Sequence, residues 1–264
     1  MSERTTTDWD ARKYDRLAAP QESWARRVLE RLPLEGGEVV LDAGCGSGRA
    51  TKLLLEKLPE GRVIGVDGSP SMIEVARETF EGDDRVSLIN CDLLELTPNL
   101  IRPEGGTDTV DAVFSNATFH WIEDHQRLFE RLHSVLRPGG RLVAQCGGRG
   151  NVEAWTRATL TAAAKKPFAE HVEGFEPWNF YGPEVTEERL REAGFEDARC
   201  WLEEMPIVVP DDPLDFVSVV GLAAHYERLP QELREPFRDA VLEAFEGEFK
   251  LRYVRLNIDA TRPA

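Results

Sequence analysis

Three acidic residues in the first half of the chain each stand at the end of an apolar, strand-like run, at Asp42, Asp67 and Asp92. The first of them opens a turn with a glycine at every second position, at Gly44, Gly46 and Gly48. A glycine has no Cβ, so the bare backbone of such a turn lets a ligand come close. A carboxylate beside that turn would repel a pyrophosphate and suits a cationic ligand. The residues therefore indicate a site for a positively charged small molecule at the strand ends.

The spacing of the glycines separates this turn from the turn that binds dinucleotides. A dinucleotide site uses G-x-G-x-x-G and seats the pyrophosphate at the N-terminus of the following helix. This chain instead has D-x-G-x-G-x-G from Asp42 to Gly48, which disfavours an NAD-dependent oxidoreductase. Asp67 follows Gly48 by about 20 residues, near the spacing at which an acidic side chain binds ribose hydroxyls.

A repeated pattern of strands and helices must position these residues. Apolar runs predict strands at 39–42, 62–67, 86–91, 109–115 and 136–144, and helix-forming segments lie between them. Ser69 is a candidate N-cap of the second of these helices, with Pro70 at its first position. Strands that alternate with helices predict an α/β fold with a doubly wound sheet, which binds ligands at the carboxyl ends of its strands.

In their order along the chain, these features resemble the motifs of the class I S-adenosylmethionine (SAM) methyltransferases. The matching segments are the glycine turn, a D-x-S-x-x-M pattern at 67–72, Asp92 with its neighbour, and an L-x-P-G-G-x-L-x element at 136–143. Two aromatic segments make the resemblance more specific, Phe119-His120-Trp121 and Trp178-Asn179-Phe180-Tyr181. With them, the chain resembles the branch of the trans-aconitate methyltransferases and other small carboxylic acid methyltransferases.

The resemblance implies a Rossmann-like sheet of seven strands in the order 3-2-1-4-5-7-6, with the last strand antiparallel. It implies SAM as the cofactor and S-adenosylhomocysteine as its product. Asp67 would bind both ribose hydroxyls, Asp92 would accept a hydrogen bond from the adenine amino group, and an N-terminal segment would close over the cofactor. The cofactor-binding residues expected on this basis are Trp9, Tyr14, Gln21, Asp42, Gly44, Gly46, Gly48, Asp67, Gly68, Ser69, Met72, Asp92, Leu93 and Asn116.

We expect one methyltransferase domain over residues 1–264. Its expected parts are an N-terminal helical lid at 1–36, a SAM-binding core at 37–147, a helical and aromatic cap insertion after the fifth strand at 148–185, and a C-terminal part of the sheet with helices at 186–264. Further predicted elements are helices at 152–165, 213–226 and 231–245, strands at 198–205 and 251–260, and a helix capped by Thr186.

The cap predicts a wall for a small-molecule methyl acceptor, and His120 is the candidate catalytic residue. A carboxylate is ionised at pH 7 and needs no base, so His120 could donate a hydrogen bond to it. A phenol, an amine or a carrier-bound acyl acid would use His120 as a base. His120 could also serve only in packing, and the chain could be a SAM-binding domain without catalytic activity. The expected substrate-binding residues are His120, Trp121, Arg149, Trp178, Asn179, Tyr181 and Arg255.

Charge and composition disfavour several other partners. The formal net charge of −16 argues against DNA or RNA, because phosphate-backbone binding rests mainly on Lys and Arg. No window approaches the ~20 apolar residues that span a membrane, and the first residues lack an apolar signal core, so a cytoplasmic protein is expected. The four cysteines show no paired spacing, and no metal-binding constellation is evident. The expected partner is a small molecule, and the chain is expected to act as a monomer or homodimer.

Overall fold

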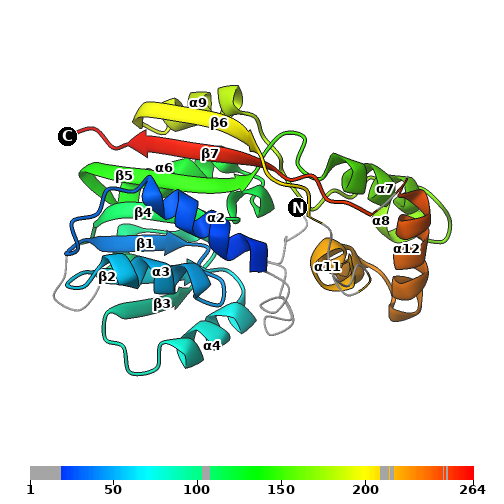
Figure 1. Ribbon diagram of the computed structural model, residues 1–264, viewed down its shortest axis with the longest axis horizontal. Coiled ribbons are helices and arrows are strands. Elements are labelled where there is room, and N and C mark those ends of the chain that lie inside the picture. The colour runs from blue at the N-terminus through cyan, green and yellow to red at the C-terminus, as the bar shows by residue number, and fades with distance from the viewer. Residues whose placement is uncertain (1–18, 103–107, 209–213, 215–216, 246, 248) are drawn as a thin grey trace.

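A central sheet lies between layers of helices, and a further group of helices extends beyond one end of the strands (Figure 1). The computed structural model describes residues 19–102, 108–208, 214, 217–245, 247 and 249–264. The strands are β1 (Val39–Ala43), β2 (Arg62–Asp67), β3 (Val86–Asn90), β4 (Val110–Asn116), β5 (Leu136–Gly147), β6 (Glu196–Glu204) and β7 (Val254–Thr261). The α-helices are α2 (Ala19–Glu30), α3 (Arg49–Lys57), α4 (Pro70–Thr79), α5 (Pro98–Ile101), α6 (His125–Val135), α7 (Glu153–Ala163), α8 (Ala169–Val172), α9 (Pro183–Glu192), α11 (Ala223–Arg228) and α12 (Gln231–Ala244). Short 3-10 helices span Leu93–Glu95 and Phe119–Trp121, and a π-helix spans Val217–Gly221.

The sheet has the strand order β3-β2-β1-β4-β5-β7-β6, which confirms the predicted order. The strands β1 to β5 pair in parallel, and β7 is antiparallel to both of its neighbours, as predicted. Because the first four strands run in the same direction, their carboxyl ends share one edge of the sheet. Asp42, Asp67 and Asn116 are thereby brought to that edge, which is called the carboxyl edge below.

Two apolar cores attach helices to the two faces of the sheet. Alternate residues of β4 point to opposite faces, so Phe114 packs with α2 and α3 whereas Val113 packs with α6 and α9. Helix α6 fits this role because its buried apolar residues recur at helical spacing. Asp124 caps it by accepting a hydrogen bond from Arg127 N–H at 2.9 Å. None of the helices within the described ranges is long and apolar enough to cross a membrane.

The helices beyond the strand ends form a cap with its own apolar core, on the right in Figure 1. This cap consists of α7, α8, the π-helix, α11 and α12, and Trp155, Phe168 and Phe237 are buried inside it. The chain enters the cap twice, once between β5 and α9 and again between β6 and β7. The sequence pattern predicted only the first entry, at 148–185, because nothing local marks two distant helical segments as packing partners.

Two predicted element boundaries were wrong. The helix expected to be capped by Thr186 begins earlier, at Pro183, since proline's fixed φ suits the first helical position. Thr186 is instead buried, and its Oγ1 donates to the Gly182 carbonyl oxygen at 2.8 Å. The single helix expected at 213–226 is replaced, within the described residues, by the π-helix followed by α11.

Candidate active site

At two of the three glycines in the turn after β1, a side chain would clash with neighbouring residues. A Cβ on Gly44 would lie 2.1 Å from Thr118 Oγ1, and a Cβ on Gly48 would lie 2.4 Å from the Phe80 ring. Thr118 Oγ1 also donates a hydrogen bond to the Gly44 carbonyl oxygen at 3.2 Å. These contacts fix the turn against the segment after β4 on one side and against the end of α4 on the other.

Within the part of the chain that the structure describes, the middle glycine, Gly46, faces open space. Among the described residues, a Cβ placed on it would meet only Met72 Sδ, at 4.0 Å, and its φ is +54°. Gly46 N–H donates to Asp67 Oδ2 at 2.9 Å, and Ser69 N–H donates to Asp67 Oδ1 at 2.8 Å. Burial raises the pKa of Asp67, and these two hydrogen bonds lower it. The half-buried carboxyl group is therefore held in one orientation beside the space at Gly46.

Asp42, at the end of β1, is almost completely buried, with 1% of its surface exposed. Its Oδ2 accepts a hydrogen bond from Thr51 Oγ1 at 2.6 Å. Its Oδ1 is buried without a hydrogen-bond partner in the described part of the chain. Burial raises the pKa of Asp42 to about 7, although the Thr51 hydrogen bond lowers it, and the charge of Asp67 raises it further. A cation beside Oδ1 would stabilise the ionised carboxylate.

The other predicted cofactor residues of the core lie along the same edge. Ser69 caps α4, as predicted. Asp92 is exposed after β3, and its Oδ1 accepts a hydrogen bond from Leu94 N–H at 2.9 Å. Leu93, the next residue, is buried. Two more predicted residues at this edge are half-buried, Gly68 and Asn116.

Three predicted cofactor residues belong to the N-terminal segment. Trp9 and Tyr14 lie outside the described residues. Gln21 is in α2, but its side chain also lies outside the described part of the structure. The closure of this segment over a cofactor stays a prediction.

A cavity opens between the end of β4 and the cap. Trp178 and Phe180 are stacked in its wall with ring centroids 5.9 Å apart, and Phe180 in turn stacks on His120 at 5.8 Å. Ala117 also lines the cavity, directly before the Thr118 that contacts the glycine turn. The cavity therefore adjoins the carboxyl edge. Its aromatic lining residues besides His120 are Trp24, Trp121, Trp155, Trp178, Phe180, Phe249 and Tyr253.

His120 lies in the cavity wall, and its hydrogen bonding defines the tautomer of its imidazole ring. Its Nδ1 accepts a hydrogen bond from Gly147 N–H at 3.3 Å. A backbone N–H can only donate, so the neutral imidazole carries its proton on Nε2. Burial, followed by the charge of Arg255, lowers the pKa of His120 well below its ordinary value of 6.5. His120 is thus suited to donate a hydrogen bond through Nε2 and is a weak base.

Arg255 brings a positive charge to the cavity although only 3% of its surface is exposed. It comes from β7, and its Nε donates to Gln145 Oε1 at 3.4 Å. Its guanidinium lies over the Trp24 ring of α2, 4.8 Å from the centroid. These contacts hold the guanidinium at the end of the cavity that lies next to the sheet.

A row of polar side chains continues from Arg255 across the sheet beneath α2. Gln145 Nε2 donates to Asn257 Oδ1 at 2.9 Å, and Asn257 Nδ2 donates to Glu203 Oε2 at 3.2 Å. Glu203 forms an ion pair with Arg27 of α2. A connected buried network of this kind fixes its members in one arrangement, so helix α2 and the cavity guanidinium are linked through hydrogen bonds.

The structure does not bring three of the predicted substrate residues to the cavity. Arg149 is exposed, and its guanidinium pairs with Glu184 at 3.4 Å. Asn179 donates its backbone N–H to the His120 carbonyl oxygen at 2.8 Å, and the Tyr181 hydroxyl donates to a backbone carbonyl before α6 at 3.3 Å. The other four, His120, Trp121, Trp178 and Arg255, do line it.

Sequence reasoning missed most of the aromatic wall. Trp24 and Trp155 lie on the buried faces of α2 and α7, and helical spacing does not reveal what such a face packs against. Tyr253 could have been found, because it precedes Arg255 by two positions, so that strand alternation puts both side chains on one side. Phe180 belongs to the loop that was predicted to line the pocket, although it was not among the individual substrate-binding residues expected from the sequence.

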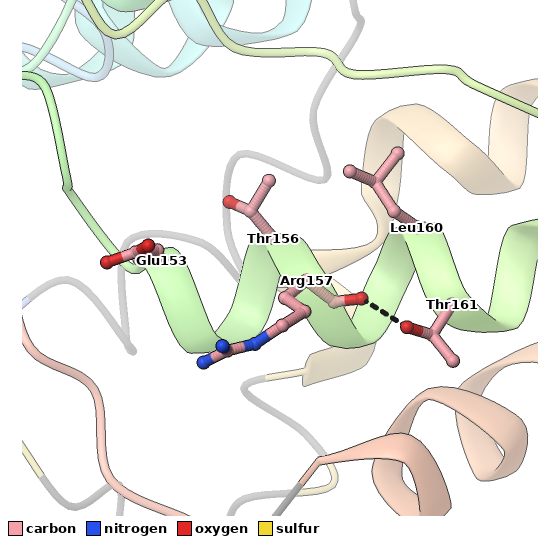
Figure 2. A pocket seen from close by; sticks show the side chains of 5 residues that line it. All are labelled: Glu153, Thr156, Arg157, Leu160 and Thr161. Carbon is pink, nitrogen blue, oxygen red and sulfur yellow. Dashed lines mark hydrogen bonds between the residues drawn. The ribbon is translucent and has the colours of Figure 1, made fainter.

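A second hollow lies on the surface of the cap, along α7 (Figure 2). Figure 2 shows its lining side chains on one helix, with Thr161 Oγ1 donating to the Arg157 carbonyl oxygen at 2.8 Å. The described residues there include no set of groups suited to catalysis. The lining residues are Glu153, Thr156, Arg157, Leu160 and Thr161.

Comparison with known proteins agrees with this geometry. A family model described as a methyltransferase domain matches residues 40–140. A trans-aconitate 2-methyltransferase from Escherichia coli is 30% identical over 268 residues, and the match covers 97% of this chain and 99% of that protein. A trans-aconitate 2-methyltransferase from Shigella dysenteriae is 29% identical over 250 residues, with coverage of 93% and 92%.

Solved structures share the fold. Phosphoethanolamine N-methyltransferase 2 of Haemonchus contortus, in complex with SAM, matches with a TM-score of 0.60 at 21% identity. That match covers 96% of this chain but 57% of the other, so this chain spans little more than half of that structure. The geranyl diphosphate C-methyltransferase of Streptomyces coelicolor matches with a TM-score of 0.53 at 17% identity, covering 99% and 83% of the two chains.

The sheet order and the site at its carboxyl edge define a class I SAM-dependent methyltransferase. Within that class, the chain belongs to the family of the trans-aconitate 2-methyltransferases.

Proposed function

We propose that this methyltransferase esterifies a small organic acid by moving a methyl group to a carboxylate oxygen. Arg255 carries the proposal, because it is a buried cation that lines an aromatic cavity next to the glycine turn. Guanidinium and carboxylate groups form strong charge-assisted hydrogen bonds, often in pairs. The curated relatives support the proposal, since they are named for an acid, trans-aconitate.

The residues of the carboxyl edge fit SAM. Asp42 Oδ1 is a buried acceptor that suits the cationic part of the cofactor, and the space beside Gly46 leaves room for it. In this proposal Asp67 holds the ribose hydroxyls, while Asp92 and Leu93 lie at the adenine. When bound, SAM supplies an activated methyl group, and it leaves as S-adenosylhomocysteine.

The residues of the cavity then bind and orient the acceptor. An ionised carboxylate already has the lone pair for the attack, so no proton has to be removed. Arg255 holds the carboxylate, and His120 Nε2–H donates a second hydrogen bond to it. Orientation of this kind supplies much of the rate of a transfer reaction. A phenol would need His120 as a base, which its burial and the nearby Arg255 charge oppose.

The proposed function is tested by incubating the protein with methyl-labelled SAM and matched sets of acceptors. Each set pairs a carboxylic acid with the corresponding phenol, amine and acyl thioester, and products are read by mass spectrometry. We expect label only in methyl esters. Label in the phenols or amines would refute the carboxylate acceptor, and SAM binding without any methylated product would point to a non-catalytic domain.

SAM binding should depend on pH through Asp42. Since the pKa of Asp42 is about 7 and a bound cation lowers it, binding releases a proton, and the affinity for SAM should fall as the pH is lowered below about 7. Calorimetry in buffers of different ionisation enthalpy measures this proton release. Asp42→Asn should remove it, whereas Asp83→Asn, on the surface beside Arg85, should keep it. Equal proton release by wild type and Asp42→Asn would show that Asp42 does not face the cofactor.

A further inference from the structure

We propose that Asn151 is a substrate-binding residue, whose side-chain amide donates a hydrogen bond to the carboxylate of the methyl acceptor. The proposal rests on the proposed function and adds a residue that the sequence pattern did not indicate. Asn151 follows the last residue of β5 by four positions, lines the aromatic cavity and is only 5% exposed. A polar group buried in a cavity wall normally has a hydrogen-bond partner for each of its ends.

The orientation of the Asn151 amide is fixed by the backbone of β7. Val254 N–H lies 3.0 Å from one end of the amide. A backbone N–H can only donate, so that end is the carbonyl oxygen, Oδ1, and the opposite end is the NH₂ group, Nδ2. Within the part of the chain that the structure describes, Oδ1 is the atom of this amide that has a hydrogen-bond partner. The two N–H bonds of Nδ2 are therefore available to a ligand in the cavity.

The turn that carries Asn151 is tied to the start of β7. Gly148 N–H donates to the Val254 carbonyl oxygen at 2.9 Å, and Val152 N–H donates to the Arg252 carbonyl oxygen at 3.0 Å. Asn151 N–H closes the turn by donating to the Gly148 carbonyl oxygen at 2.9 Å. A donor on a backbone held in this way is preorganised, so that little entropy is lost when it binds a ligand.

Gly147, the last residue of β5, brings the amide next to the two groups already proposed to bind the carboxylate. Its N–H donates to His120 Nδ1 at 3.3 Å, and the register of the sheet pairs it with Arg255. A Cβ on Gly147 would lie 2.9 Å from Asn151 Nδ2 and 2.5 Å from the Phe180 ring. The NH₂ group therefore lies over Gly147, beside a ring that lines the cavity. Donors from three separate segments surround this glycine.

The indole and hydroxyl groups of the wall can donate hydrogen bonds as well, from Trp24, Trp121, Trp155, Trp178 and Tyr253. Each of these donors is carried by an aromatic ring that also forms the apolar part of the wall. Trp155 Nε1, for example, is itself buried without a hydrogen-bond partner among the described residues. Asn151 differs because its whole functional group is polar and a backbone hydrogen bond directs it. A purely structural role would need only Oδ1.

A neutral donor suits an acceptor that loses its charge in the reaction. The carboxylate is an anion before methyl transfer and part of an uncharged ester afterwards. A second buried cation beside it would bind the ionised acid more strongly than the reacting group, which slows the transfer. The Asn151 N–H orients the carboxylate without adding such a charge, and orientation supplies much of the rate.

The test replaces Asn151 by aspartate, which keeps the acceptor for Val254 N–H and exchanges the donor for a second oxygen. The probes are a panel of mono-, di- and tricarboxylic acids that includes 3-phenylpropanoate and trans-aconitate, and kcat/KM is measured with saturating SAM. For every acid that the wild type methylates, Asn151→Asp should lower kcat/KM by about 100-fold or more, because a like charge then faces the carboxylate. The affinity for SAM, measured by calorimetry, should stay close to that of the wild type.

Two further variants separate the donor from the added charge and from the turn. Asn151→Ala removes the donor without adding a charge and should lower kcat/KM by about tenfold or more. Arg149→Leu, on the same turn but with its guanidinium at the surface beside Glu184, should keep wild-type kinetics.

Wild-type kinetics in Asn151→Asp, with a lowered melting temperature only in Asn151→Ala, would show that the amide merely supports the backbone and would overturn the proposal. A loss of SAM affinity as large as the loss of kcat/KM would overturn it as well. Failure of the wild-type protein to methylate any acid of the panel, with SAM bound, would instead refute the proposed function.

Discussion

Replacing Arg255 by leucine should lower kcat/KM for the acid by about 100-fold or more and leave SAM affinity nearly unchanged. Removing one partner of a buried, hydrogen-bonded charge pair costs about 2–5 kcal/mol, because the other charge stays buried without compensation. Each 1.4 kcal/mol corresponds to about tenfold. Steady-state kinetics with the labelled cofactor measures the effect, and calorimetry with SAM shows that the variant is folded.

Two further arginine variants make this result specific. Arg149→Leu should behave as wild type, because that guanidinium pairs with Glu184 at the surface. Arg255→Lys should recover part of the activity, since lysine keeps the charge but lacks the planar fork that binds a carboxylate with two hydrogen bonds. Wild-type kinetics in Arg255→Leu would show that the substrate carboxylate binds elsewhere.

Replacing Gly46 by valine should weaken SAM binding by about 100-fold or more. The new side chain would enter the open space beside Asp67, where the cofactor is proposed to meet bare backbone. Overpacking of a fitted site costs about 1–3 kcal/mol or more, to which the loss of direct contact adds. The affinity is measured by calorimetry with SAM and with S-adenosylhomocysteine.

Gly82 offers a matched control for backbone strain. Its φ is +82°, against +54° for Gly46, and a Cβ on it would meet nothing within 4 Å. Gly82→Val therefore carries a similar conformational cost after α4, away from the carboxyl edge. It should lower the melting temperature but not the affinity for SAM. Equal losses of affinity in both variants would mean that strain, and not occupied space, explains the result at Gly46.

Much of the fold could be predicted because its signals are local. An apolar run, a glycine turn and a serine followed by proline, as at Ser69 and Pro70, are each read from a few neighbouring residues. The order of the strands came from resemblance to a family and not from the pattern itself. Prediction failed where two local signals competed. The hydroxyl of Thr186 suggested a helix N-cap, but the helix begins one turn earlier, at Pro183.

The residues of the carboxyl edge could be predicted because they too follow from local sequence signals. The cavity could not be predicted in this way. Asp42 and Asp67 end their own strands, so their position follows from the strand pattern. The cavity wall instead joins Trp24, Trp155 and Tyr253, which come from three distant segments. Whether they meet depends on how the cap packs on the sheet. In the aromatic loop, alternate residues face opposite sides. Trp178 and Phe180 therefore line the cavity, whereas Asn179 and Tyr181 do not.

The most direct measurement is a crystal structure with S-adenosylhomocysteine and a small carboxylic acid bound together. We expect the ribose hydroxyls on Asp67, the sulfur facing the aromatic cavity, and the acid with its carboxylate on Arg255. S-adenosylhomocysteine bound away from the carboxyl ends of β1 and β2 would contradict the proposed cofactor site and every role that depends on it.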